Sequence, residues 1–120
     1  MARISGSKSD ADDGVKTALT EMEALLRRVG AIGHADQLVS FLALLESDRL
    51  QAIEILAGGA IWGSAGSFLD LYLCRANGHK SDNFKRDNRS LNGYLLRLLQ
   101  ALENNGVRRP YFDQIRDFLT

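Results

Sequence analysis

The chain has 120 residues, of which 45% are hydrophobic and 25% are charged, and its formal net charge is zero. This length suits one domain with one core, and the composition is that of an ordinary globular protein. The sequence contains no apolar run of the roughly 18 to 20 residues that cross a bilayer, which argues against a membrane span.

The compartment is inferred from the N-terminal segment and from cysteine usage. The first residues lack the apolar stretch of a secretory signal, and a single cysteine, Cys74, cannot form an internal disulfide. Both features predict a cytoplasmic protein.

Charge is unevenly distributed along the chain. Residues 1–60 carry 6 Lys/Arg and 9 Asp/Glu, whereas residues 61–120 carry 9 and 6, with the basic residues concentrated between Arg75 and Arg97. Such a bias is usually a solvated surface, although it can also mark a docking face or a nucleic-acid face.

The first predicted elements follow a short polar leader. Residues 1–9 are small, polar and aperiodic, so we predict a disordered leader followed by a single helical domain over residues 10–120. A helix is predicted from Asp10 until Gly30 stops it, because apolar residues recur at three- and four-residue spacings along one face. These residues are Val15, Ala18, Leu19, Met22, Leu25, Leu26 and Val29.

Two further helices are predicted before the glycine-rich segment. The second ends near Glu46 and carries an apolar stripe made of Leu38, Phe41, Leu42 and Leu45. Ser47 is a candidate N-cap for the third, which ends at Gly58. Its predicted buried residues are Leu50, Ile53 and Leu56.

Three helices are predicted after the glycine-rich segment. Ser67 and Asp70 have the spacing of a capping box and predict a helix that ends near Asn77. Its apolar residues are Phe68, Leu71, Tyr72 and Cys74. The next helix carries Leu91, Tyr94, Leu95, Leu98, Leu99 and Leu102. Gly93 within it costs about 1 kcal/mol relative to alanine, which suggests a close helix crossing there.

Pro110 suits the first turn of a last helix. Its predicted inward residues are Tyr111, Phe112, Ile115, Phe118 and Leu119. We therefore expect an all-α fold, a single compact bundle of about six helices.

The glycine-rich segment between residues 58 and 73 admits two interpretations. A glycine loop before a helix can bind phosphate, and Gly63–Ser67 is the candidate for a phosphate or nucleotide site, but the lysine of a P-loop is missing. The structural interpretation is a turn and a helix cap formed by Gly58, Gly59, Gly63, Gly66, Ser67 and Asp70. Trp62 is either a core plug or an exposed anchor for a partner.

The segment from Gly63 to Leu71 reads Gly-Ser-Ala-Gly-Ser-Phe-Leu-Asp-Leu and follows a Gly-Gly pair. It resembles a signature in small bacterial helical domains, some of which are encoded near toxins and are presumed immunity proteins. The resemblance covers about residues 58–73. It implies a helical protein that neutralises a cognate toxin.

The reactive side chains do not form a recognisable catalytic or metal motif. His34 and His79 stand far apart without neighbouring ligands, so we predict surface or capping roles and no metal site. Cys74 lies among apolar residues and is predicted to be a small buried side chain. We expect no cofactor and no enzymatic activity.

The sequence therefore favours a protein-binding domain, with a cognate toxin as the predicted partner, bound by occlusion of its active site. One candidate docking surface is acidic and comprises Asp10, Asp12, Asp13, Glu21 and Glu23. The other comprises Trp62, Arg86 and Arg89. The alternatives are the phosphate site above, a weak nucleic-acid contact through Lys85–Arg97, and a homodimer formed through the leucine-rich helices.

Overall fold

The computed structural model describes the backbone of residues 2–63 and 65–120, and the side chains of residues 14–63 and 65–120. Its regular elements are α1 (Ala2–Arg28), α2 (Ile32–Ser47), α3 (Arg49–Leu56), α4 (Gly59–Trp62), the 3-10 turn η1 (Arg75–Asn77), α5 (Phe84–Asn104) and α6 (Phe112–Leu119). The predicted all-α class is confirmed. Because α4 is a single turn, the described residues form five longer helices rather than about six.

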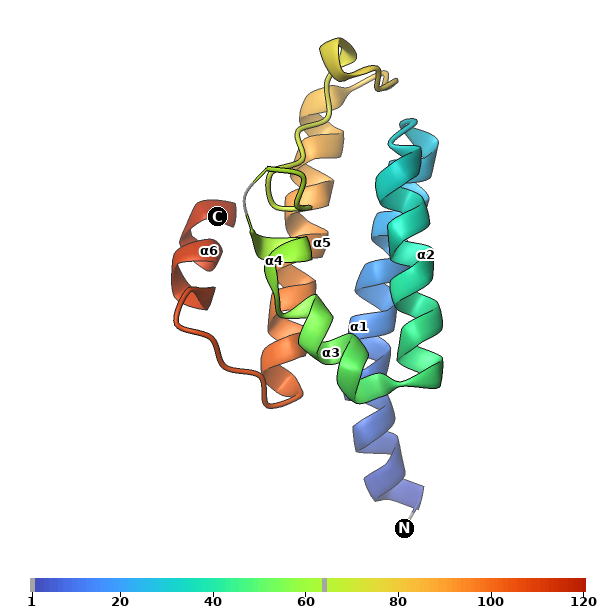
Figure 1. Cartoon of the computed structure of the whole chain (residues 1–120), viewed down its shortest axis with the longest axis vertical. Helices are drawn as coiled ribbons and strands as arrows, with labels where there is room; N and C mark the ends of the chain where they lie inside the picture. The colour runs from blue at the N-terminus through green and yellow to red at the C-terminus, as the bar shows by residue number, and fades with distance from the viewer. Residues whose placement is uncertain (1, 64) are drawn as a thin grey trace.

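Helices α1 and α5 are the central pair of the fold (Figure 1). Helix α2 packs against α1, and α6 packs against α5. The short helices α3 and α4 lead from the end of α2 back toward the middle of the bundle (Figure 1). None of the described helices is both long and apolar enough to cross a membrane.

The apolar stripes predicted for the two central helices form a large part of the core. All seven residues of the first predicted stripe are buried, six on α1 and Val29 directly after it, and so are the five leucines of the predicted stripe on α5. Burying one large side chain of this kind contributes about 1.5 to 3 kcal/mol, so this pair of stripes contributes substantially to stability. The two helices approach closely at Gly14, where a Cβ would lie 3.4 Å from the Cβ of Ala101.

The expected crossing at Gly93 is wrong. A Cβ added to Gly93 would meet no atom within 4 Å among the described residues. The close contact between helices lies at Gly14 instead, on the partner helix of α5.

Helix α1 begins at Ala2, whereas we predicted a start near Asp10. The side chains of residues 2–13 lie outside the described residues. The leader over residues 1–9 therefore stays a prediction, as do the roles of Asp10, Asp12 and Asp13.

Helix α3 differs from expectation at its cap and in its buried face. Asp48, not Ser47, is the N-cap, because its carboxylate accepts a hydrogen bond from the Gln51 N–H at 3.2 Å. The buried face contains Ala52 and Leu56, while Leu50 is 83% exposed. Leu50 lies about 200° around the helix from Ala52, so it faces solvent.

The predicted helix after Ser67 is wrong, although its first hydrogen bond forms. The Asp70 N–H donates to Ser67 Oγ at 3.2 Å, as a capping residue would require. The chain then makes turns up to Asp70 and has no regular secondary structure over residues 71–74, called the extended segment below, where the backbone of Cys74 is extended. The capping geometry therefore closes a turn rather than starting a helix.

Tertiary contacts explain why this apolar run is extended. The Asn88 side chain accepts from the Leu73 N–H at 2.9 Å and donates to the Leu73 carbonyl at 2.8 Å, replacing the bonds of a helix. Phe68 and Leu73 are both fully buried. Residues five positions apart lie about 140° apart around an α-helix, so one helix could not bury both against the same partner.

Helix α6 buries Phe112, Ile115 and Leu119 against the core but leaves Phe118 70% exposed. The inward position predicted for Phe118 is therefore wrong. The helix is eight residues long and packs mainly against α5, so a neighbour covers only part of its wide apolar face.

Candidate protein-docking surface

Trp62 is a core residue rather than an exposed anchor. Its side chain is only 6% exposed, and its indole N–H donates to the Leu56 carbonyl at 2.8 Å. Its ring packs edge to face against Phe112, at 6.3 Å between centroids. One edge of Trp62 lines a hollow of about 270 Å³ with Tyr111 and three glycines of the turn.

The contacts of the glycine turn give it a structural role. A Cβ at Gly63 would lie 2.5 Å from the Gly59 carbonyl oxygen, so only glycine fits there without a shift. Gly66 has φ +89°, a conformation that favours glycine. Ser67 is buried, and its hydroxyl donates to the Gly63 carbonyl at 2.9 Å. Gly58 is the N-cap of α4, where its backbone is extended.

The predicted acidic surface is partly neutralised by contacts within the chain. Glu21 pairs with Arg97 at 3.2 Å, and Glu23 accepts from Arg27 at 2.5 Å. Glu21 thus joins the acidic half of the sequence to the basic half. At these positions, the charge bias along the sequence therefore does not produce separate acidic and basic surfaces.

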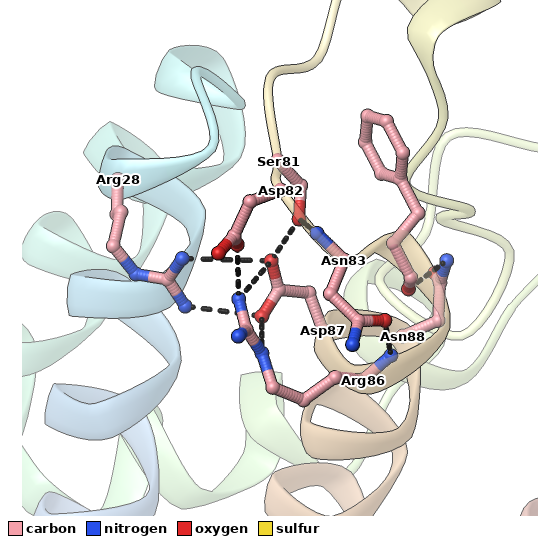
Figure 2. Close-up of polar contacts among 8 residues, drawn as sticks. Arg28, Ser81, Asp82, Asn83, Arg86, Asp87 and Asn88 are labelled. Carbon is pink, nitrogen blue, oxygen red and sulfur yellow. Dashed lines mark hydrogen bonds and ion pairs between the residues drawn. The ribbon is translucent and has the colours of Figure 1, made fainter.

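The predicted basic residue Arg86 belongs to an ion network at one end of the bundle (Figure 2). Its guanidinium donates to Asp82 at 2.7 Å and to Asp87 at 3.1 Å. Asp87 is 1% exposed and also accepts from Arg28 at the end of α1, at 3.1 Å, and from the Ser81 hydroxyl. The network joins α1, the loop before α5 and the first turn of α5.

Charge and burial compete at Asp87. Burial alone would raise the pKa of its carboxyl, because desolvation disfavours the charged form. Hydrogen bonds from Ser81, Arg28 and Arg86, together with the positive charge of Arg28, outweigh burial and hold this pKa well below its usual range. Asp87 is therefore a structural carboxylate, and Arg86 serves the fold.

Arg89, the remaining predicted partner-binding residue, is exposed on α5, as is Lys85 one turn earlier. Arg97, at the end of the predicted nucleic-acid segment, pairs with Glu21. The segment from Lys85 to Arg97 thus combines exposed cations with cations that already hold acidic partners.

A surface that the sequence analysis missed lies between α5, α6 and the extended segment. It is a hollow of about 240 Å³, here called the aromatic groove, and its lining residues are Leu69, Asp70, Leu71, Tyr72, Asn88, Asn92 and Phe118. Tyr72 is 64% exposed and Phe118 is 70% exposed. Large exposed aromatic side chains beside a hollow are typical of protein-binding sites.

Polar contacts hold one wall of the aromatic groove in place. The Tyr72 carbonyl accepts from the Asn77 amide at 3.0 Å, and Asn88 pairs with both backbone groups of Leu73. Asn88 is itself anchored by donating to the Phe84 carbonyl at 3.0 Å. Hydrogen bonds within the chain therefore fix the position of the segment that carries Tyr72.

Sequence reasoning missed the groove because it assigned both aromatic residues to buried helix faces. Tyr72 was placed on a helix that does not form, and Phe118 on a face that no neighbour covers fully. One signal was available: an eight-residue helix with four large apolar residues has more apolar surface than one packing partner can cover.

The histidines and the cysteine have local contacts. His34 packs edge to face on Phe68, at 4.9 Å between centroids, and His79 Nδ1 accepts from the Cys74 N–H at 3.1 Å. Cys74 is half-buried. Over residues 14–63 and 65–120, His, Cys, Asp and Glu side chains form no group of three that could hold a metal ion.

The described residues form a small all-helical domain with a groove lined by exposed aromatic side chains. Comparison with models of known families, with curated proteins and with solved structures found no match to the chain.

Proposed function

We propose that this protein is a non-catalytic binding domain that docks another protein through the aromatic groove. The observation that carries the proposal is the pair of exposed aromatic side chains, Tyr72 and Phe118, which line one hollow on a preordered surface. Aromatic residues are over-represented among the few side chains that dominate interface energy. Truncating such a residue at an interface commonly costs 2 kcal/mol or more.

The proposed partner is a bacterial toxin, whose active site or substrate entrance the domain covers. The toxin as partner is suggested by the resemblance of residues 58–73 to presumed immunity proteins. Steric occlusion needs only a stable surface and a matching partner, so a domain of this size suffices.

Co-expression with the protein encoded by the neighbouring gene tests the proposal. We expect growth inhibition by that protein to be relieved, and the two chains to elute together from a sizing column. Unrelieved inhibition without a complex would refute the proposal.

A variant pair locates the surface. Tyr72→Ala with Phe118→Ala should abolish both relief and co-elution. Leu50→Ala is the matched control, because Leu50 is 83% exposed but lies on α3, outside the groove. Equal binding by both variants would show that the partner docks elsewhere.

A further inference from the structure

We infer that the aromatic groove recognises a lysine or arginine side chain presented by the partner beside an apolar side chain. The inference rests on the proposed docking role of the groove and adds the chemistry of what enters it. Among the described residues that line the groove, Asp70 is the one with a charged side chain. A carboxylate beside exposed rings is the combination that attracts an organic cation.

The Asp70 carboxylate is available for such a contact. Asp70 is exposed, and its backbone N–H is held by Ser67 Oγ at 3.2 Å, which fixes the position of the residue. Within the described part of the chain, its carboxylate makes no hydrogen bond or ion pair. It differs in this from Glu21, Glu23 and Asp87, which already have cationic partners.

The two aromatic rings favour the same ligand. A guanidinium or ammonium group over a tyrosine or phenylalanine face is attracted by the ring quadrupole. Leu69 and Leu71 add apolar lining beside the rings, so the methylene stem of a lysine or arginine, or a neighbouring apolar side chain, has a matching surface. A hollow of about 240 Å³ suits one or two side chains rather than a whole helix.

Two cations on α5 oppose this attraction at longer range. Lys85 and Arg89 are exposed on the helix that carries Asn88 and Asn92, but neither lines the groove. A cation seated in the groove would contact the Asp70 carboxylate directly, whereas Lys85 and Arg89 act from outside the lining through solvent in which salt screens exposed charges.

Three blocked tetrapeptides test the inference: acetyl-Gly-Arg-Leu-Gly-amide and its citrulline and glutamate counterparts. Citrulline keeps the shape of arginine and removes its charge. In a titration followed by amide NMR on the full chain, the arginine peptide should shift the resonances of Tyr72, Asn92 and Phe118. Its affinity should exceed that of the citrulline peptide by about 5-fold, the joint effect of one exposed ion pair and one cation–π contact.

Asp70→Asn assigns the effect to the carboxylate. This substitution should lower the affinity for the arginine peptide about 3-fold and leave the affinity for the citrulline peptide unchanged. Glu46→Gln is the matched control, because it removes the same charge from an exposed position on α2, outside the groove, and should change neither affinity.

Three results would overturn the inference: stronger groove shifts with the glutamate peptide, equal affinities for arginine and citrulline, or no groove shifts with the arginine peptide. The proposed function has its own readout. If the peptides give one of these results but the double variant Tyr72→Ala, Phe118→Ala no longer binds the partner protein, docking at the groove stands and only the cationic ligand is wrong.

Discussion

Replacing Asp87 with alanine should destabilise the fold by about 2 to 4 kcal/mol. The carboxylate accepts hydrogen bonds from Arg28, Ser81 and Arg86, and a bond to a charged group is worth about 1.5 to 3 kcal/mol. The cost is smaller than the sum of these bonds, because the Arg28 and Arg86 side chains are about half exposed and form hydrogen bonds with water when released. The expected cost therefore lies near the lower end of values for breaking buried pairs.

Asp82→Ala is the matched control for this substitution. The Asp82 side chain is 82% exposed and pairs with Arg86, and exposed pairs contribute at most about 1 kcal/mol. Urea unfolding of both variants at pH 7 measures the two costs. Equal destabilisation by the two substitutions would refute the structural role given to Asp87.

The loss of stability caused by Asp87→Ala should depend on pH. Because the folded state lowers the pKa of Asp87, its stabilisation is fully present above the unfolded value of about 3.9 and is lost as the pH falls toward the folded value. The stability gap between wild type and Asp87→Ala should therefore be constant from pH 7 to pH 5 and narrow below about pH 4. A gap that stays unchanged down to pH 2 would contradict the argument.

Three other substitutions test the packing by urea unfolding. Gly63→Ala should lower the free energy of unfolding by about 2 kcal/mol, because its Cβ would lie 2.5 Å from the backbone oxygen of Gly59. Gly59→Ala should be neutral or slightly stabilising, because its Cβ would meet open space. Similar losses of stability in the two variants would contradict the close approach at Gly63. Tyr111→Phe should lower the free energy of unfolding by about 1 kcal/mol, because the Tyr111 hydroxyl donates a hydrogen bond to the Ala57 carbonyl. An unchanged urea midpoint would contradict that bond. Leu56→Ala should cost about 2 to 5 kcal/mol and Leu50→Ala less than about 0.5, and equal costs would contradict the assigned face of α3.

Helices with one long apolar stripe were predictable from the sequence, and their residues show why. The apolar residues from Val15 to Leu26 on α1 and from Leu91 to Leu102 on α5 repeat at three- and four-residue spacings over several turns. A repeat of that length allows one helical face and little else, so local pattern and tertiary packing agree.

Short segments were less predictable because contacts distant in sequence decide them. The run after Ser67 has helical spacing and a capping residue, but Asn88 on α5 takes the backbone bonds of Leu73. The groove was missed for the same reason. The sequence of α6 indicates more apolar surface than one neighbour can cover, but which residue stays exposed depends on what packs beside the helix.

The first turn of α5 connects the bundle to the proposed docking surface. Asp87 and Asn88 are consecutive, so their side chains leave the helix about 100° apart and reach different neighbours. Asp87 bonds to Arg28 on α1 (Figure 2). Asn88 bonds to the backbone of Leu73 and so holds the segment that carries Tyr72. That wall of the groove has no helix of its own, so a few polar bonds fix its shape while the leucine core fixes the bundle. Loss of the Asn88 bonds would therefore impair docking before it impaired folding.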